Sequence, residues 1–265
     1  MKNLLTIAGS DSCGGAGIQA DIKTFSAHGC YAMSVITAIT AQNTVAVNAV
    51  LDTTPEMIKE QLDAIFTDIR VDGVKIGMVS AAPAIKVIVE GIKKYAPPIV
   101  VVDPVMVSTS GFNLLNPAAI DTLIHTLLPR ATIITPNIPE AEILANMKIR
   151  TTADIETSAK IIHGIGAKYV LIKGGHMPND ANDLLYDGTN MHWIHGTRIA
   201  TKNTHGTGCT LSSAITANLA NGMNILESVS AAKEYVKHAI ENSISLGHGC
   251  GPTNHFYKYF GGNND

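Results

Sequence analysis

The residues most suggestive of chemistry lie in the stretch Asn203–Ser213, which reads NTHGTGCTLSS. Its two glycines, Gly206 and Gly208, precede small helix-forming residues, and glycine lets backbone N–H groups turn toward a ligand. A helix that begins here adds about half a positive charge at its N-terminus. The stretch therefore predicts an anion site, with Cys209 placed to act on the bound anion.

Cys209 has two interpretations. Most free cysteines are small, buried hydrophobic residues. A helix N-terminus and nearby backbone N–H groups would instead depress the pKa of the thiol, and the resulting thiolate could take a proton from an alcohol.

Asn137 and Glu140 stand three residues apart at the start of a predicted helix. This is the spacing of a capping box, in which each side chain bonds the other residue's backbone N–H. Amide and carboxylate oxygens also suit Mg²⁺, which keeps several waters in protein sites. Asp103 could serve that ion or pair with a lysine, and Lys173 is either a strand-end cation or a phosphate ligand. The residue types leave both interpretations open in each case.

A second glycine cluster, Gly14–Gly17, lacks the spacing of a dinucleotide fingerprint or a P-loop. It is either a tight strand-to-helix turn or part of a ligand site, and Asp21 could complement the helix dipole or face a ligand. Gln42 is either a hydrated turn residue or a reader of an aminopyrimidine, since its amide offers a donor and an acceptor side by side.

These candidates follow apolar runs that alternate with helical patterns. Predicted strands cover Leu4–Ala8, Val35–Ala38, Gly73–Gly77, Ile99–Val102, Thr132–Thr135 and Tyr169–Lys173. Predicted helices cover Ala16–His28, Pro55–Thr67, Ala81–Tyr95, Pro117–Leu127, Pro139–Ala145, Ala153–Ile165, Cys209–Asn221 and Ile225–Ser245. Continuous apolar strands suit a mostly parallel sheet with helices on both faces, and ligands bind beyond the carboxyl ends of such strands. Asp187-Gly188 predicts a hairpin turn within Asp183–Thr201.

Composition indicates one α/β domain over residues 1–265, because no linker, repeat or low-complexity tract divides the chain. A formal net charge of -3 provides no basic field for nucleic acid, and no apolar run is long enough to span a bilayer. Four scattered cysteines without a Cys-x-x-Cys spacing favour reduced thiols in the cytoplasm and disfavour a structural zinc site. We therefore expect a cytoplasmic protein that acts on small molecules.

Three further expectations concern histidines, a polar segment and the end of the chain. The histidines His176, His205 and His255 are not spaced closely enough in sequence to suggest a metal site. Each is therefore expected to be a polar residue of a site wall or a hydrogen-bond partner. Pro, Asn and Asp accumulate at His176–Asp183, which is typical of a lid, and the tail Gly261–Asp265 is expected to fray.

An anion site, a candidate base, a lysine and a possible Mg²⁺ site are the parts of phosphoryl transfer. Their ordered set resembles the hydroxymethylpyrimidine/phosphomethylpyrimidine kinases of thiamine biosynthesis, within the ribokinase-like superfamily. The segments that carry the resemblance are Ala8–Asp11, Gly14–Asp21, Lys23–Phe25, Ile36–Ala38, Gln42–Thr44, Lys75–Met78, Asp103–Met106, Thr135–Ala141, Lys173–His176, Thr204–Thr210, and Gly251-Pro252 before His255-Phe256.

The resemblance implies a single-domain ribokinase-like fold and an ATP- and Mg²⁺-dependent kinase. The residues that would surround the pyrimidine are Gly9, Asp21, Gln42, Met78, Val105 and Cys209. Asn137 and Glu140 would hold Mg²⁺ through water, with Asp103 nearby. The ATP phosphates would be bound by Lys173, Thr204 and the turn Gly206, Thr207, Gly208 and Cys209. The family often forms dimers, so a homodimer is a further expectation.

One departure from the wider superfamily leaves the substrate open. The usual base in the glycine turn is aspartate, whereas this chain has Cys209, as do the pyrimidine kinases and some pyridoxal kinases of similar sequence. The nearest alternative is therefore a pyridoxal or pyridoxine kinase. An alternative of another class is a non-catalytic pyrimidine-binding regulatory domain, although Lys173, Asn137 and Glu140 count against it because a sensor needs no ATP phosphate site.

Overall fold

Strands and helices alternate along the chain in a computed structural model, which describes residues 1–106, 116–175 and 181–260. The strands are β1 (Asn3–Asp11), β2 (Tyr31–Gln42), β3 (Val47–Asp52), β4 (Gly73–Ile76), β5 (Val100–Val102), β6 (Ile133–Ile134), β7 (Tyr169–Ile172), β8 (Asp183–Tyr186) and β9 (Met191–Ile194). The helices are α1 (Gly17–Ala27), α2 (Pro55–Phe66), α3 (Ala82–Tyr95), α4 (Pro117–Thr122), α5 (Ile138–Ala145), α6 (Thr152–His163), α7 (Thr207–Ala220), α8 (Ile225–Glu241) and α9 (Tyr257–Phe260). The structure does not describe residues 176–180 of the expected lid, which include His176, or the tail 261–265.

The strands form a nine-stranded sheet in the order β3-β2-β1-β4-β5-β6-β7-β8-β9. All pairings from β2 to β7 are parallel, whereas β3, β8 and β9 join the two edges in antiparallel fashion. The predicted mostly parallel sheet is thus confirmed, and so is the hairpin, which joins β8 to β9.

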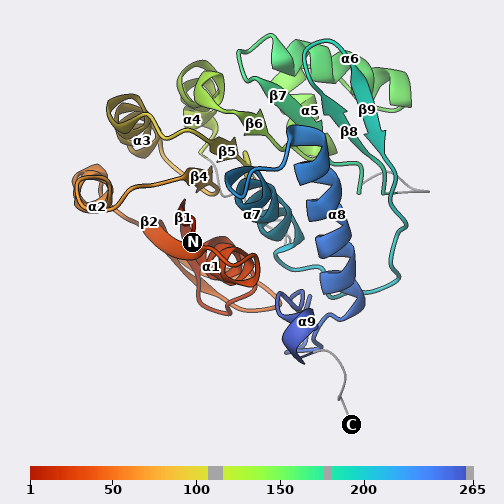
Figure 1. The fold of residues 1–265 in the computed structure, drawn as a ribbon, viewed down its shortest axis with the longest axis horizontal. Coiled ribbons are helices and arrows are strands. Elements are labelled where there is room, and N and C mark those ends of the chain that lie inside the picture. Colours follow the sequence, from red (N-terminus) through yellow and green to blue (C-terminus); the bar gives the residue numbers. More distant parts are fainter. Residues whose placement is uncertain (107–115, 176–180, 261–265) are drawn as a thin grey trace.

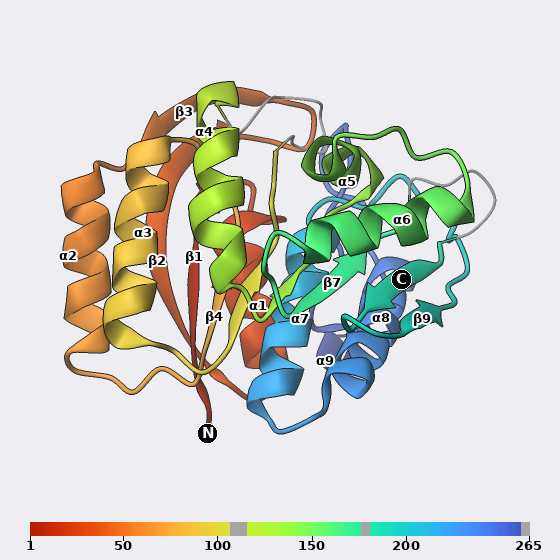
Figure 2. The ribbon, with the colours of Figure 1, turned by 90° about the horizontal axis from the view of Figure 1, so that it is seen from above.

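Helices cover both faces of the sheet, as predicted (Figures 1 and 2). On one face, α2 to α6 bury a large apolar cluster against the sheet. On the other face, α7 and α8 pack against β5, β6, β7 and β8, while α1 and α7 pack against β1. Because every interior strand is covered twice, its side chains are apolar in both directions, which explains runs such as Val100–Val102.

The structure departs from the predicted elements at particular places. Strand β3 was missed because it is an edge strand whose side chains are mostly exposed, so it lacks an apolar run. The helix predicted to reach Leu127 leaves α-helical geometry after Thr122 and continues as a π-helical turn (Leu123–Leu127) and a 3₁₀ turn (Leu128–Arg130). The last long helix, α8, ends at Glu241 and not at Ser245.

A fully buried ion pair lies at the middle of the sheet. Lys75 of β4 and Asp21 of α1 are each 0% exposed, and the Lys75 Nζ lies 2.9 Å from Asp21 Oδ2. Thr6 of β1 donates to the same oxygen at 2.5 Å, and Ser213 of α7 donates to Oδ1 at 2.7 Å. Burial alone would lower the pKa of Lys75, but the Asp21 carboxylate raises it above its ordinary value, so the lysine stays charged.

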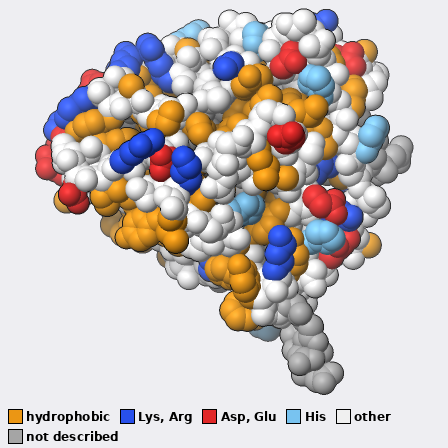
Figure 3. Space-filling view, in the orientation of Figure 1, with side chains coloured by type: hydrophobic (Ala, Val, Ile, Leu, Met, Phe, Trp, Pro, Cys, Tyr) orange, Lys and Arg blue, Asp and Glu red, His pale blue; other side chains and the backbone are white. Residues whose placement is uncertain are grey.

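Lys and Arg side chains lie scattered among acidic and apolar ones on the face shown in Figure 3 and form no continuous basic field there. Within the described part of the chain, no helix is both long and apolar enough to cross a membrane.

We predict that Lys75→Met lowers the free energy of unfolding by about 3–5 kcal/mol, because it leaves the buried Asp21 carboxylate without its cation. Urea unfolding followed by circular dichroism measures this loss. Adding Asp21→Asn to Lys75→Met should recover part of the stability, since no uncompensated charge then remains in the core.

The matched control is Lys59→Met, which breaks the Lys59–Asp63 pair on α2, where the lysine side chain is 58% exposed. This change should leave the urea midpoint nearly unchanged, because solvent screens an exposed ion pair. Equal losses for the two lysine variants would contradict a special role for the buried pair.

Candidate active site

A cavity of about 790 Å³ lies at the carboxyl ends of the parallel strands. Residues that follow β4, β5, β6 and β7 all line it, which is where open α/β sheets bind ligands. The predicted site residues among its lining are Gly9, Gln42, Met78, Asp103, Val105, Asn137, Glu140, Lys173, Thr204, Gly206, Thr207, Gly208 and Cys209. The structure therefore brings together residues that lie 200 positions apart, between Gly9 and Cys209.

The predicted anion turn forms the start of α7. Gly206 is the N-cap of this helix and has a φ of 81°, a conformation that favours glycine. A Cβ at Gly206 would overlap the carbonyl oxygen of Gly15, so the two glycine segments of the chain touch directly. The helix begins at Thr207, two residues earlier than predicted, which places Cys209 inside its first turn.

Lys173 and Asp103 face this turn as an ion pair. The Lys173 Nζ lies 2.7 Å from Asp103 Oδ1, and Thr135 donates to the same oxygen at 3.1 Å. A Cβ placed on Gly208 would lie 3.4 Å from both Asp103 Oδ2 and Lys173 Nζ. A positive side chain and the N-terminus of α7 therefore border the same part of the cavity, which suits a bound anion.

Asn137 and Glu140 form the capping box of α5 and also line the cavity. Asn137 Oδ1 accepts the Glu140 N–H at 2.9 Å, and Glu140 Oε2 accepts the Asn137 N–H at 2.9 Å. Burial raises the pKa of Glu140 to about 7, with Lys173 opposing the shift and Asp103 adding to it. Once Glu140 is ionised, two buried carboxylates stand beside one lysine, and this oxygen-rich set fits a hard divalent cation.

The predicted depression of the Cys209 pKa is wrong. Burial raises the pKa of this thiol to about 11, against the lowering effect of Lys75 and with Asp21 and Asp103 adding to the increase. The helix N-terminus and a hydrogen bond from the Gly17 N–H do not outweigh the loss of solvent. Cys209 is therefore a protonated thiol at neutral pH.

The same cavity is lined by the other predicted residues, Gln42, Met78, Val105 and Gly9. Gln42 ends β2, and its Oε1 accepts a hydrogen bond from Thr40 Oγ1 at 3.3 Å while its Nε2 lies 3.5 Å from His205 Nε2. A Cβ at Gly9 would come within 3.0 Å of the Met78 sulfur, so the glycine allows close packing at this wall.

Asp21 is the exception among the predicted residues. It does not line the cavity, because both of its oxygens are bonded to Lys75, Thr6 and Ser213 beneath the site. Asp21 therefore joins α1 to β1, β4 and α7 through these bonds.

Sequence reasoning missed several residues that reach the cavity. Asp11 lines it and pairs with His205, whose Nε2 lies 2.8 Å from Asp11 Oδ2. Burial would raise the pKa of Asp11, but the bonds from His205 and from the backbone of Ala16 and Cys13 lower it to about 2. The signal that could have found Asp11 is its place directly before the glycine cluster, where its oxygens can cap the turn.

Known proteins resemble this chain over most of its length. A family model described as phosphomethylpyrimidine kinase matches residues 11–254. The hydroxymethylpyrimidine/phosphomethylpyrimidine kinase of Rhizobium meliloti is 50% identical over 260 residues, which are 97% of each chain. The crystal structure of phosphomethylpyrimidine kinase from Clostridium difficile is 51% identical, with a TM-score of 0.82 over 91% of this chain and 100% of that one. A pyridoxal kinase of Bacillus subtilis, solved as an ADP complex, is 41% identical, with a TM-score of 0.91 over 98% and 99%.

We predict that alkylation of Cys209 by iodoacetamide accelerates throughout the range from about pH 7 to 9.5, because the thiolate fraction keeps rising below a pKa of about 11. Mass spectrometry of the peptide that contains Cys209 measures the rate. In urea, the rate for the same cysteine should be half-maximal near the ordinary thiol pKa of about 8.5 and level off above about pH 9.5. A plateau below about pH 8 in the folded protein would show that the thiol is activated after all.

Proposed function

The chain belongs to the phosphomethylpyrimidine kinase family, and we propose that it carries out two successive phosphorylations in thiamine biosynthesis. In the first, ATP phosphorylates the hydroxymethyl group of 4-amino-5-hydroxymethyl-2-methylpyrimidine. In the second, another ATP converts the monophosphate to the diphosphate. The observation that carries the proposal is one cavity that is lined by Gln42, by Lys173 and by the first turn of α7.

The phosphates of ATP would lie against the start of α7 and Lys173. The backbone N–H groups of the Gly206–Cys209 turn and the lysine charge are fixed before the ligand arrives, so they can stabilise charge on the transferred phosphoryl without reorganising. The proposed use of ATP is supported by the ADP complex of the related Bacillus subtilis pyridoxal kinase.

The aminopyrimidine would be read by Gln42. Its amide offers a donor and an acceptor side by side, which match the acceptor and donor of an aminopyrimidine edge. Met78 and Val105 supply apolar surface for the ring, and Gly9 lets Met78 pack closely at this wall.

Cys209 would position the acceptor hydroxyl. It lines the cavity inside the first turn of α7, next to the turn that would hold the phosphoryl group. Because the thiol is protonated at neutral pH, it must lose its own proton before it can serve as a base. Orienting the alcohol for in-line attack is a contribution that needs no ionisation.

Mg²⁺ would be held by Glu140, Asn137 and Asp103, partly through water, because these oxygen donors match its preference. When bound, the ion would neutralise charge on the ATP phosphates. Lys173 would keep Asp103 in place from the opposite side, through their 2.7 Å contact.

The main alternative is a pyridoxal kinase with the same apparatus. It is favoured by the TM-score of 0.91 to the Bacillus subtilis pyridoxal kinase, which exceeds the 0.82 to the Clostridium difficile enzyme. Sequence identity points the other way, at 41% against 51%. A non-catalytic pyrimidine-binding domain is disfavoured by the buried Lys173–Asp103 pair beside the glycine turn. The proposal also includes a location in the cytoplasm, small-molecule substrates and assembly as a homodimer.

Coupled measurement of ADP release with each acceptor tests this function. We expect turnover with the hydroxymethylpyrimidine, further turnover with its monophosphate, and a kcat/KM for pyridoxal that is at least about 100-fold lower, a difference of about 3 kcal/mol in transition-state binding. Equal or greater turnover of pyridoxal would favour the alternative, and binding without ADP release would favour the regulatory domain.

The Gln42→Ala enzyme locates the acceptor site in the same assay. It should raise the KM for the pyrimidine about 10-fold or more, consistent with the loss of one or two hydrogen bonds, and leave the KM for ATP near its original value. An equal increase in both KM values would show that Gln42 does not read the pyrimidine.

We further predict that Mg²⁺ binding to the nucleotide complex strengthens with pH between about 6 and 8. A Glu140 with a pKa of about 7 must lose its proton before it can contribute to the ion's site. Below that pKa, affinity should rise by up to about tenfold per pH unit, measured by calorimetry.

Two variants separate this effect from the titration of the nucleotide itself. Glu140→Gln should retain only the pH dependence of the nucleotide. Glu142→Gln, on the same helix but outside the cavity lining, should behave like the original protein, because its neighbours hold the Glu142 pKa below its usual range. Identical pH profiles for all three proteins would show that Glu140 does not contribute to Mg²⁺ binding.

A further inference from the structure

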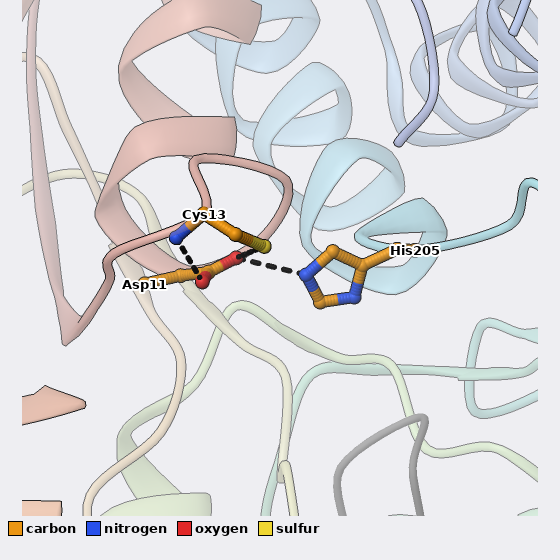
Figure 4. Close-up of side chains that lie close together, drawn as sticks. All are labelled: Asp11, Cys13 and His205. Atoms are coloured by element: carbon orange, nitrogen blue, oxygen red, sulfur yellow. Dashed lines mark hydrogen bonds and ion pairs between the residues drawn. The ribbon is translucent and has the colours of Figure 1, made fainter. Parts of the chain in front are cut away.

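Three side chains with different metal-binding atoms converge at the edge of the cavity. The donor atoms of Asp11, Cys13 and His205 all lie within 4.8 Å of one another. Figure 4 shows Asp11 and Cys13 on the segment before α1, with the His205 ring facing them from the segment that leads into α7. Asp11 and His205 are 3% and 5% exposed, and Cys13 is half-buried.

The carboxylate and the imidazole are held in place by the surrounding chain. Asp11 accepts backbone hydrogen bonds from Cys13 at 2.9 Å, Gly15 at 3.0 Å and Ala16 at 2.8 Å. A Cβ on Gly15 would overlap the His205 ring, so the imidazole packs directly on this backbone. The Cys13 bond ends on Oδ1 and the Gly15 and Ala16 bonds end on Oδ2, so the carboxylate is fixed on both sides, and an ion would take the direction from Oδ2 that the His205 N–H now occupies.

One donor separation matches that of a tetrahedral zinc site, and a second is about 0.5 Å shorter. Zinc bonds of about 2.0 Å to oxygen and nitrogen and about 2.3 Å to sulfur put neighbouring ligands roughly 3.3–3.5 Å apart. Asp11 Oδ2 lies 2.8 Å from His205 Nε2 and 3.4 Å from Cys13 Sγ. The imidazole would have to move outward by about 0.5 Å to admit the ion, and Asp11 and His205 line the cavity, from which water can reach the ion.

We propose that Asp11, Cys13 and His205 form a binding site for a borderline-soft divalent metal ion such as Zn²⁺, distinct from the Mg²⁺ site at Glu140. Binding replaces two protons, the thiol proton of Cys13, which leaves for solvent, and the proton that His205 Nε2 donates to Asp11, so that a neutral imidazole protonated only at Nδ1 offers its Nε2 lone pair to the ion. The carboxylate and the thiolate then balance the two charges of the ion. Mixed nitrogen and sulfur donors favour Zn²⁺ over Mg²⁺.

Occupancy of this site should inhibit the kinase. The His205 Nε2 lies 3.5 Å from the Gln42 Nε2, so an ion bound to His205 would crowd the residue assigned to read the pyrimidine. This consequence rests on the proposed function, whereas metal binding does not. Inhibition should be competitive with the pyrimidine and not with ATP, which would bind at Lys173 and the start of α7.

Metal binding is tested with Co²⁺ as a spectroscopic substitute for Zn²⁺, using the whole protein without substrates. We expect one Co²⁺ per chain, a thiolate-to-cobalt charge-transfer band, and loss of the band on addition of Zn²⁺. Cys13→Ser should abolish the band and weaken binding at least about tenfold, while its hydroxyl can still donate to Asp11. Cys250→Ser, at another half-buried free cysteine, is the matched control and should retain the band.

A band that survives in Cys13→Ser, or the absence of any thiolate band in the original protein, would overturn the site. His205→Gln provides a second variant should Cys13→Ser fail to fold, as judged by circular dichroism, and it should also lose at least about tenfold in Co²⁺ affinity.

Inhibition is tested separately, with buffered free Zn²⁺ and excess Mg²⁺ in the ADP-release assay. Cys13→Ser should keep the basal activity and raise the concentration of Zn²⁺ for half inhibition at least about tenfold. Equal inhibition of both proteins would place the inhibitory ion elsewhere, for instance at Glu140, and would overturn the link to this site. Absence of kinase activity with normal Co²⁺ binding would instead contradict the proposed function and leave the metal site standing.

Discussion

The buried ion pair between Lys75 and Asp21 is the constraint on which the arrangement of the active site depends. Charges taken out of water are tolerated only when partners surround them, and here the partners come from β1, β4, α1 and α7. These elements must therefore meet at one place for the core to form. Ser213, the α7 partner, lies one helical turn after Cys209, so the pair also fixes the helix that begins the site.

The same pair shapes the electrostatics of the cavity above it. The Lys75 charge favours a thiolate at Cys209, whereas Asp21 and Asp103 oppose it and burial opposes it most strongly. The result is a neutral thiol beside a positive anion-binding turn. Such a combination can orient an alcohol without adding a negative charge where phosphates must bind.

A second contact joins the two glycine segments. Gly206 leaves no room for a side chain against the Gly15 carbonyl, and Asp11 bonds both the Gly14–Gly17 turn and His205. The segment before α1 and the segment before α7 are thereby locked together. The two joined segments line both the proposed pyrimidine end and the proposed phosphate end of the cavity. Their contact also brings Asp11, Cys13 and His205 together.

Features governed by near neighbours were determined by the sequence alone. Apolar runs predicted the interior strands, the Asn137–Glu140 spacing predicted a capping box that the structure contains, and Gly206 predicted a turn at the start of a helix. Only the tertiary structure decided the protonation of Cys209, the burial of Asp21 and the meeting of Asp11 with His205, 194 positions away. The physical reason is that solvent exclusion and long-range charge depend on which segments pack together, and no local pattern of residues specifies those quantities.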